Sequence, residues 1–117
     1  MAQHLELGER GEALAAEFLI EKGFQILARN YRYGKAEIDL IVKKDIFVVF
    51  VEVKSLTNLK FGMPEIAVDK KKIFLIKKAA DNYVYRNDWH GQIRFDIVSV
   101  IFRANKTEIM HFEDAFY

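Results

Sequence analysis

Residues 36–54 read AEIDLIVKKDIFVVFVEVK, and the rest of the chain is best interpreted from this segment. Two apolar runs of β-type residues are joined by a short polar segment at 43–45, which predicts a β-hairpin. Both faces of the second run begin apolar, as in a central strand covered on both sides. Glu52 and Lys54 end that run side by side on one face. Because burying an unpaired charge is costly, these two residues need a partner or a ligand.

The length of the hairpin turn determines whether acidic residues of the two strands meet. Strict alternation places Asp39 on one face of the first strand and Ile38 and Leu40 on the other. With a turn of even length, Asp39 faces Phe50 directly and Glu52 diagonally, whereas an odd turn puts the two acids on opposite faces. The alternative is a glutamate–lysine pair at a solvated sheet edge, and the Glu-Ile-Asp of the paired strand disfavours it.

Two acids and a lysine on one sheet face suit a particular chemistry. Carboxylates a few Å apart resist joint ionisation, and a divalent cation between them reverses that balance. Hard oxygen ligands select Mg²⁺ or Mn²⁺. Either ion can polarise a phosphoryl oxygen and activate a bound water. A neighbouring ammonium, here Lys54, can orient that water or stabilise charge on the phosphate. Hydrolysis of a phosphodiester is the reaction that fits best.

With Asp39, Glu52 and Lys54, the chain resembles the PD-(D/E)XK nuclease superfamily, and more closely the YraN-type family of uncharacterised, endonuclease-like proteins. The matching segments cover nearly the whole chain: GERGE at 8–12 with Ala16 and Leu19, NYR at 30–32, EIDLI at 37–41, FVEVK at 50–54, FG at 61–62 with Pro64, Lys72, RFD at 94–96 and DAF at 114–116. The resemblance implies an α/β fold with a restriction-endonuclease-like αβββαβ core, in which helices flank a mixed central sheet.

The resemblance also implies roles for particular residues. Asp39 and Glu52 would be metal ligands, together with the carbonyl of Val53, while Lys54 would assist the water or the transition state. Glu12 lies on the apolar face of the predicted first helix, and in nuclease-like domains such a glutamate often joins the metal cluster directly or through water. An amphipathic helix with one misplaced acid is the alternative for Glu12.

Two basic residues are candidates for contact with a nucleic acid. Lys72 matches a position of the family and lies in the basic cluster 70–78, although charge runs on helices are usually solvated faces. Arg32, near the end of the first strand, could meet a phosphate backbone, and an ordinary solvated strand end explains it as well.

The remaining elements follow from periodicity and punctuation. We expect a helix at 5–22, strands at 24–33, 92–102 and 108–112, and a second helix from Pro64 to about Tyr85. The polar loop 55–63 is a candidate flap over the substrate. The order is α-β-β-β-α-β-β, which predicts one α/β domain spanning residues 1–117.

Composition limits the chemistry and the location that the protein can have. The 117 residues are 51% hydrophobic, carry a net charge of +1 and include no cysteine, which excludes disulfides and thiol catalysis. We find no membrane span and no signal peptide, so a cytoplasmic location is the default expectation. The partner expected is a nucleic acid, most simply DNA, and an enzyme that cuts both strands would have to form a homodimer. The rival functions are a non-catalytic nucleic-acid-binding module and a protein-interaction scaffold.

Overall fold

The computed structural model describes residues 2–57 and 68–116. The elements come in the predicted order: α1 (Ala2–Glu21), β1 (Gln25–Tyr33), β2 (Ala36–Lys44), β3 (Phe47–Thr57), α2 (Lys70–Arg86), β4 (Gln92–Phe102) and β5 (Thr107–Phe112). The expected limits of the strand 92–102 are confirmed, and the last strand begins one residue earlier than expected. No helix in the part of the chain that is described is long and apolar enough to cross a membrane.

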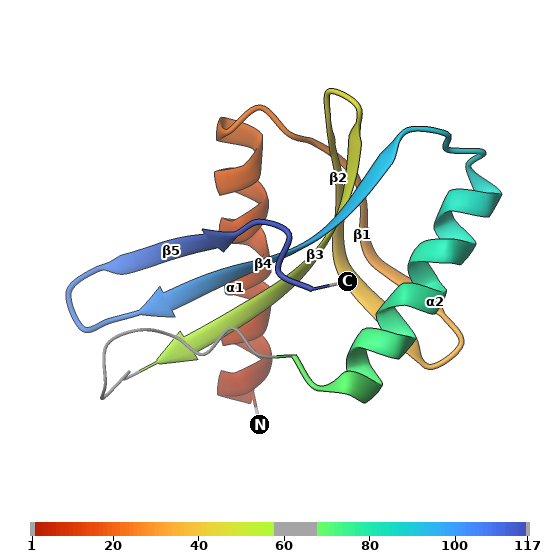
Figure 1. The fold of residues 1–117 in the computed structure, drawn as a ribbon. Coiled ribbons are helices and arrows are strands. Elements are labelled where there is room, and N and C mark those ends of the chain that lie inside the picture. The colour runs from red at the N-terminus through yellow and green to blue at the C-terminus, as the bar shows by residue number, and fades with distance from the viewer. Residues whose placement is uncertain (1, 58–67, 117) are drawn as a thin grey trace.

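The five strands form one mixed sheet in the order β1-β2-β3-β4-β5. Neighbouring strands are antiparallel except β3 and β4, which are parallel and are connected through α2. Figure 1 shows α1 behind the sheet and α2 in front of it, over β1 and β2. The α/β fold with a mixed sheet flanked by helices is therefore confirmed, and it is compatible with a restriction-endonuclease-like core.

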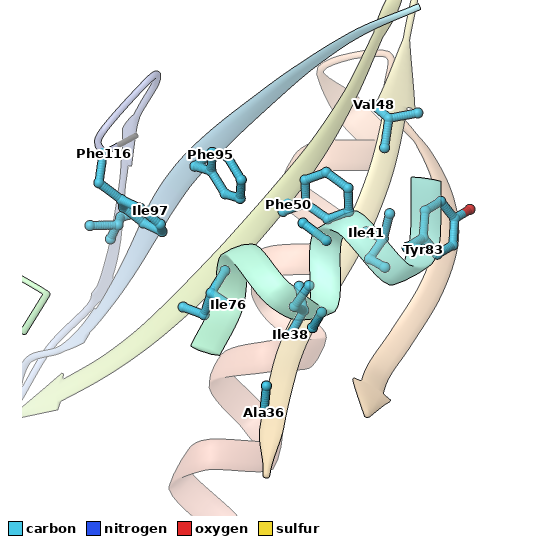
Figure 2. Packing of buried hydrophobic residues seen from close by; sticks show 12 residues of the cluster. Ala36, Ile38, Ile41, Val48, Phe50, Ile76, Tyr83, Phe95, Ile97 and Phe116 are labelled. Carbon is cyan, nitrogen blue, oxygen red and sulfur yellow. The ribbon is translucent and has the colours of Figure 1, made fainter. Parts of the chain in front are cut away.

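Each helix covers its own hydrophobic cluster. On the α1 side, Ala15, Ala16 and Leu19 are buried against small β-branched residues of the central strands. On the α2 side, Phe50 and Phe95 form the centre of the cluster, as Figure 2 shows. Their rings stack with centroids 5.5 Å apart, and Phe116 from the C-terminal segment stacks on Phe95 at 5.3 Å. Burial of such side chains contributes about 1.5–3 kcal/mol each to folding.

The second helix begins later than the sequence predicts. Pro64 lies outside the described residues, but Val68 and Asp69 are not helical and α2 starts at Lys70, so the predicted start is wrong for these two residues. The side chain of Asp69 accepts hydrogen bonds from the backbone N–H groups of Lys71 and Lys72. An aspartate at the N-cap satisfies N–H groups that the first turn cannot satisfy itself, and this fixes the start of the helix.

The β2–β3 turn has an even length, since only Asp45 and Ile46 lie between the strands. Asp45 adopts a positive φ of 55°, which a tight two-residue turn requires. The register expected for an even turn is wrong by two residues, because Ile41, not Asp39, lies opposite Phe50. The difference arises because Lys43 and Lys44, assigned to the turn by their polarity, continue the strand.

The faces of β2 also depart from strict alternation. Ile38 packs in the α2-side cluster, whereas Leu40 packs in the α1-side cluster, so the prediction that both share a face is wrong. The reversal falls at Asp39, whose neighbour on β1 is Asn30, between the pairs Arg29–Leu40 and Tyr31–Ile38. Asn30 has a left-handed backbone with φ 51°, a conformation that breaks the regular pleat.

The predicted flap at 55–63 begins as part of the sheet. Ser55 and the two residues that follow belong to β3, and residues 58–63 lie outside the described part of the chain. On the α1 side, a Cβ atom at Gly11 would overlap the hydroxyl of Ser55. Glycine at position 11 therefore lets the helix backbone lie directly against the end of β3, and this brings Glu12 to the same end of the sheet.

Candidate functional site: an acidic pocket where β2 and β3 separate

The candidate site lies where the regular β2–β3 pairing ends. The last regular pair is Leu40 with Val51. Beyond it, Oδ2 of Asp39 accepts a hydrogen bond of 2.8 Å from the backbone N–H of Val53. The carboxylate thus satisfies a strand N–H in place of a backbone carbonyl, and the two strands separate at this point. Because β2 reverses its faces here, the side chain of Asp39 is held beside the end of β3.

Asp39 and Glu52 line the same pocket, which has a volume of about 200 Å³. Glu52 is only 5% exposed, so its charge is almost completely removed from solvent. The walls come from the β1–β2 turn, both strands and the first two turns of α2: Lys35, Ala36, Glu37, Asp39, Glu52, Lys72, Leu75 and Ile76. The pocket is large enough for a hydrated cation or for a phosphate group.

The electrostatics of the pocket are unfavourable to ionised Asp39. Burial, and after it the charge of the nearby Glu52, raises the pKa of Asp39 from 3.8 to about 8, against the lowering effect of the Val53 N–H. Carboxylic acids crowded in this way retain a proton at neutral pH unless a cation compensates them. The pair is therefore poised to bind positive charge.

Glu12 approaches the pocket from α1. Burial raises the pKa of Glu12, and the carboxylates of Glu37, Glu52 and Glu9 raise it further. Glu12 also contributes to raising the pKa of Asp39. The first helix thus places a further carboxylate near the separated strands, close enough to raise the pKa of Asp39.

The two predicted nucleic-acid contacts are both paired with carboxylates in the structure. Lys72, in the first turn of α2, forms an ion pair with Glu52 through Nζ and Oε2. Nε of Arg32 lies 2.9 Å from Oε2 of Glu37, and the arginine side chain is 79% exposed. Arg32 is therefore a surface residue with a weak ion pair, whereas Lys72 is part of the pocket itself.

Val53 and Lys54 complete the set of predicted site residues. Val53 is at the site through its backbone, because its N–H binds Asp39. Lys54 follows Glu52 by two positions on β3, is half-buried, and is paired in register with Ser99 of β4. The hydroxyl of Ser99 is buried, and no hydrogen-bond partner for it lies in the described ranges 2–57 and 68–116.

A group of three metal-type ligands lies elsewhere among the described residues. Ligand atoms of Asp96, His111 and Glu113 lie within 4.8 Å of one another, while Asp39, Glu52 and Glu12 do not form such a group. Arg94 already occupies this second cluster, with Nε 2.8 Å and Nη2 2.9 Å from the two oxygens of Asp96. The cluster is therefore a closed ion-pair network. It joins β4 to β5 and to the segment after β5.

Sequence reasoning missed this network because its members are far apart in the chain. Nε2 of His111 lies 2.7 Å from Oδ2 of Asp96, and the backbone N–H of Asp114 donates to Oδ1. Although burial alone would raise it, the pKa of Asp96 is lowered by the hydrogen bonds from His111 and Arg94. The segment RFD at 94–96 was a signal, since an arginine and an aspartate two apart on a strand share a face.

A groove beside the pocket was also not predicted. It has a volume of about 350 Å³ and lies between the β1–β2 turn and the second half of α2. Its lining consists of two exposed tyrosines, Tyr33 and Tyr85, together with Lys78, Asp81 and Asn82. Exposed aromatic rings beside a lysine are the side chains on which unpaired bases stack.

Comparison with known proteins identifies the family of the chain. The sequence profile of the family described as Uncharacterised protein family UPF0102 matches residues 11–100, and the chain belongs to this family. It is 47% identical to a UPF0102 protein of Flavobacterium psychrophilum over 117 residues, which are 100% of this chain and 98% of the relative. It is 44% identical to a UPF0102 protein of Syntrophomonas wolfei over 112 residues, 95% of this chain and 97% of the relative. The matched range contains the positions of Glu12, Asp39, Glu52 and Lys72.

Proposed function

We propose that this protein is a metal-dependent phosphodiesterase that cleaves DNA or a structured nucleic acid, with its active site in the pocket of Asp39 and Glu52. One observation carries the proposal: two carboxylates are held together in a largely buried position, where burial and the proximity of Glu52 disfavour the ionisation of Asp39. Such crowding of carboxylates destabilises the fold. Crowded acids with perturbed pKa values are typical of active sites and ligand-binding sites.

The residues of the pocket fit a hard divalent cation such as Mg²⁺ or Mn²⁺. Oxygen ligands from Asp39 and Glu52 face a space of about 200 Å³, and the ammonium of Lys72 already binds Glu52 as a cation. In the proposal Asp39 and Glu52 hold the metal, with the Val53 carbonyl as a further ligand. The metal would supply polarisation of a phosphoryl oxygen and acidification of water.

The other side chains of the site have separate tasks. The Val53 N–H fixes the orientation of the Asp39 carboxylate before any metal binds. Lys54 would stabilise charge on the phosphate, and Glu12 would act through an intervening water, because it is not part of a tight ligand cluster. Residues of α2 and the β1–β2 turn, including the groove of Tyr33 and Tyr85, would hold the nucleic acid beside the pocket.

The test is cleavage of a panel of linear, nicked and four-way-junction DNAs with Mg²⁺, Mn²⁺ or a chelator. We expect cleavage that needs the metal and that falls at least about 100-fold in Glu52→Gln. The matched control is Glu108→Gln, because Glu108 pairs with Arg103 on the distant β4–β5 hairpin. Cleavage that survives in Glu52→Gln would rule out this pocket as the active site.

One observation favours a second candidate, a nucleic-acid-binding module without catalysis. The groove between Tyr33 and Tyr85 provides a stacking surface that needs no metal. This alternative predicts that DNA binding is equal in Mg²⁺ and in chelator, with no cleavage under either condition, and that Tyr85→Ala weakens binding. A fluorescence anisotropy titration with the same DNA panel separates the two candidates.

A further inference from the structure

Lys72 occupies an unusual position for a surface lysine. Its backbone belongs to the first turn of α2, where its N–H is held by the cap residue Asp69. Its side chain is 51% exposed, yet its ammonium reaches Glu52, which is 5% exposed. The lysine therefore bridges solvent and the interior of the acidic pocket, from a backbone that is fixed by the helix cap.

The charges around this ion pair stabilise the ammonium of Lys72, so the pocket already holds a cation. Burial of Lys72 opposes its charge, whereas Glu52, Asp39 and Asp69 favour it, and the net result is a raised pKa. One positive charge thus compensates part of a site that contains the carboxylates of Asp39 and Glu52. A divalent cation bound by the same oxygens would repel the ammonium, since both would compete for Oε2 of Glu52.

We propose that Lys72 is an exchangeable internal cation of the acidic pocket: it holds Glu52 in the metal-free protein and turns outward to a phosphate of the nucleic acid when the pocket binds a divalent metal. This inference rests on the proposed function of the same pocket. The outward turn needs only side-chain rotation, because the lysine stem is flexible and already half exposed, while Asp69 keeps the helix start in place.

The exchange would couple the metal to the nucleic acid. A metal ion releases Lys72, and the released ammonium neutralises one phosphate, so each ligand increases the affinity for the other. Removing the lysine side chain uncouples the two. Metal then binds without displacing a competitor, and nucleic acid loses the contact that metal would have provided.

Isothermal titration calorimetry with Mn²⁺ on the full chain, without nucleic acid, tests whether Lys72 and the metal compete for Glu52. We expect Lys72→Met to bind Mn²⁺ about tenfold more tightly than the unchanged protein, in the usual range of coupling between sites. Lys71→Met is the matched control, because Lys71 has the same charge and lies beside Lys72 on the exposed surface of α2, and we expect its Mn²⁺ affinity to change less than about twofold.

A second variant keeps the test decisive if Lys72→Met does not fold. Lys72→Arg retains the positive charge and can bind a carboxylate in a bidentate manner, so we expect Mn²⁺ affinity to fall by about fivefold. A further readout is the salt dependence of DNA binding with Ca²⁺ as the probe ion. Adding Ca²⁺ should steepen the slope by about one unit in the unchanged protein and leave it unchanged in Lys72→Met.

The outcomes separate this inference from the proposed function. If Glu52→Gln abolishes Mn²⁺ binding while both Lys72 variants bind Mn²⁺ as the unchanged protein does, the pocket is a metal site and the role of Lys72 is wrong. If neither the variants nor the unchanged protein bind Mn²⁺, the metal site fails together with the inference. Tighter binding in Lys72→Met with the expected salt slopes supports the exchange.

Discussion

Replacing Asp39 with asparagine should stabilise the metal-free protein at neutral and mildly alkaline pH. The pKa of Asp39 is about 8 in the folded protein, against 3.8 for an ordinary aspartate, because of burial and then the proximity of Glu52. The folded state therefore binds this proton more tightly than the unfolded chain. As pH rises from about 4 to 8, the unfolded chain loses its proton first, and the free energy of unfolding decreases.

The size of the effect follows from the difference between the two pKa values. Each pKa unit corresponds to about 1.4 kcal/mol, so the upper limit at pH 8 is about 5 kcal/mol. The substituted asparagine could not ionise in either state, and its amide oxygen could still accept the hydrogen bond from the Val53 N–H. Relaxation of the site and its coupling to Glu52 reduce the expected gain to about 1–3 kcal/mol.

Urea denaturation of the metal-free protein at pH 5, 6.5 and 8 measures this prediction. The gain in Asp39→Asn should grow with pH. Asp45→Asn is a matched control, because Asp45 is an exposed aspartate in the β2–β3 turn and asparagine tolerates its positive φ. A gain that is equal at pH 5 and pH 8, or a loss of stability at pH 8, would refute the electrostatic reasoning.

Further predictions concern the surrounding structure. Asp96→Asn should lower the free energy of unfolding by about 2–4 kcal/mol at pH 7, because it leaves the partly buried Arg94 without its carboxylate partner. Since the pKa of Asp96 is lowered in the fold, its contribution should disappear in urea titrations as pH falls below about 4. Gly11→Ala should cost about 1–3 kcal/mol through overlap with Ser55. The added Ser55→Gly change should recover most of that loss, whereas Gly8→Ala, which meets no atom within 4 Å, should be neutral or stabilising in thermal melts.

The fold could be read from sequence because its signals are local. The run 92–102 is rich in β-branched and aromatic residues and is bounded by a glycine-containing loop and a polar turn, so its limits were predictable. The β2–β3 hairpin was predictable as well, although the length and position of its turn were not, because lysines at 43 and 44 are polar and strand length is set by pairing with Val48 and Phe47. Polarity alone cannot distinguish an exposed strand end from a turn.

The features of the site that were missed depend on backbone conformation and on distant contacts. The reversal of faces at Asp39 accompanies the left-handed backbone of Asn30, which no pattern in the sequence marks. The ion pair between Lys72 and Glu52 depends on where α2 begins and how it lies on the sheet, and that position is fixed by the Asp69 cap. Alternation could place two acids near each other, but it could not identify the cation that faces them.

The most direct measurement of the central claim is the position of bound metal. Crystals of the protein containing Mn²⁺ should give an anomalous difference peak in the pocket, about 2.1 Å from carboxylate oxygens of Asp39 and Glu52. In those crystals the ammonium of Lys72 should have left Glu52. A peak at Asp96 and His111 instead, or no peak with Lys72 still bound to Glu52, would contradict the account.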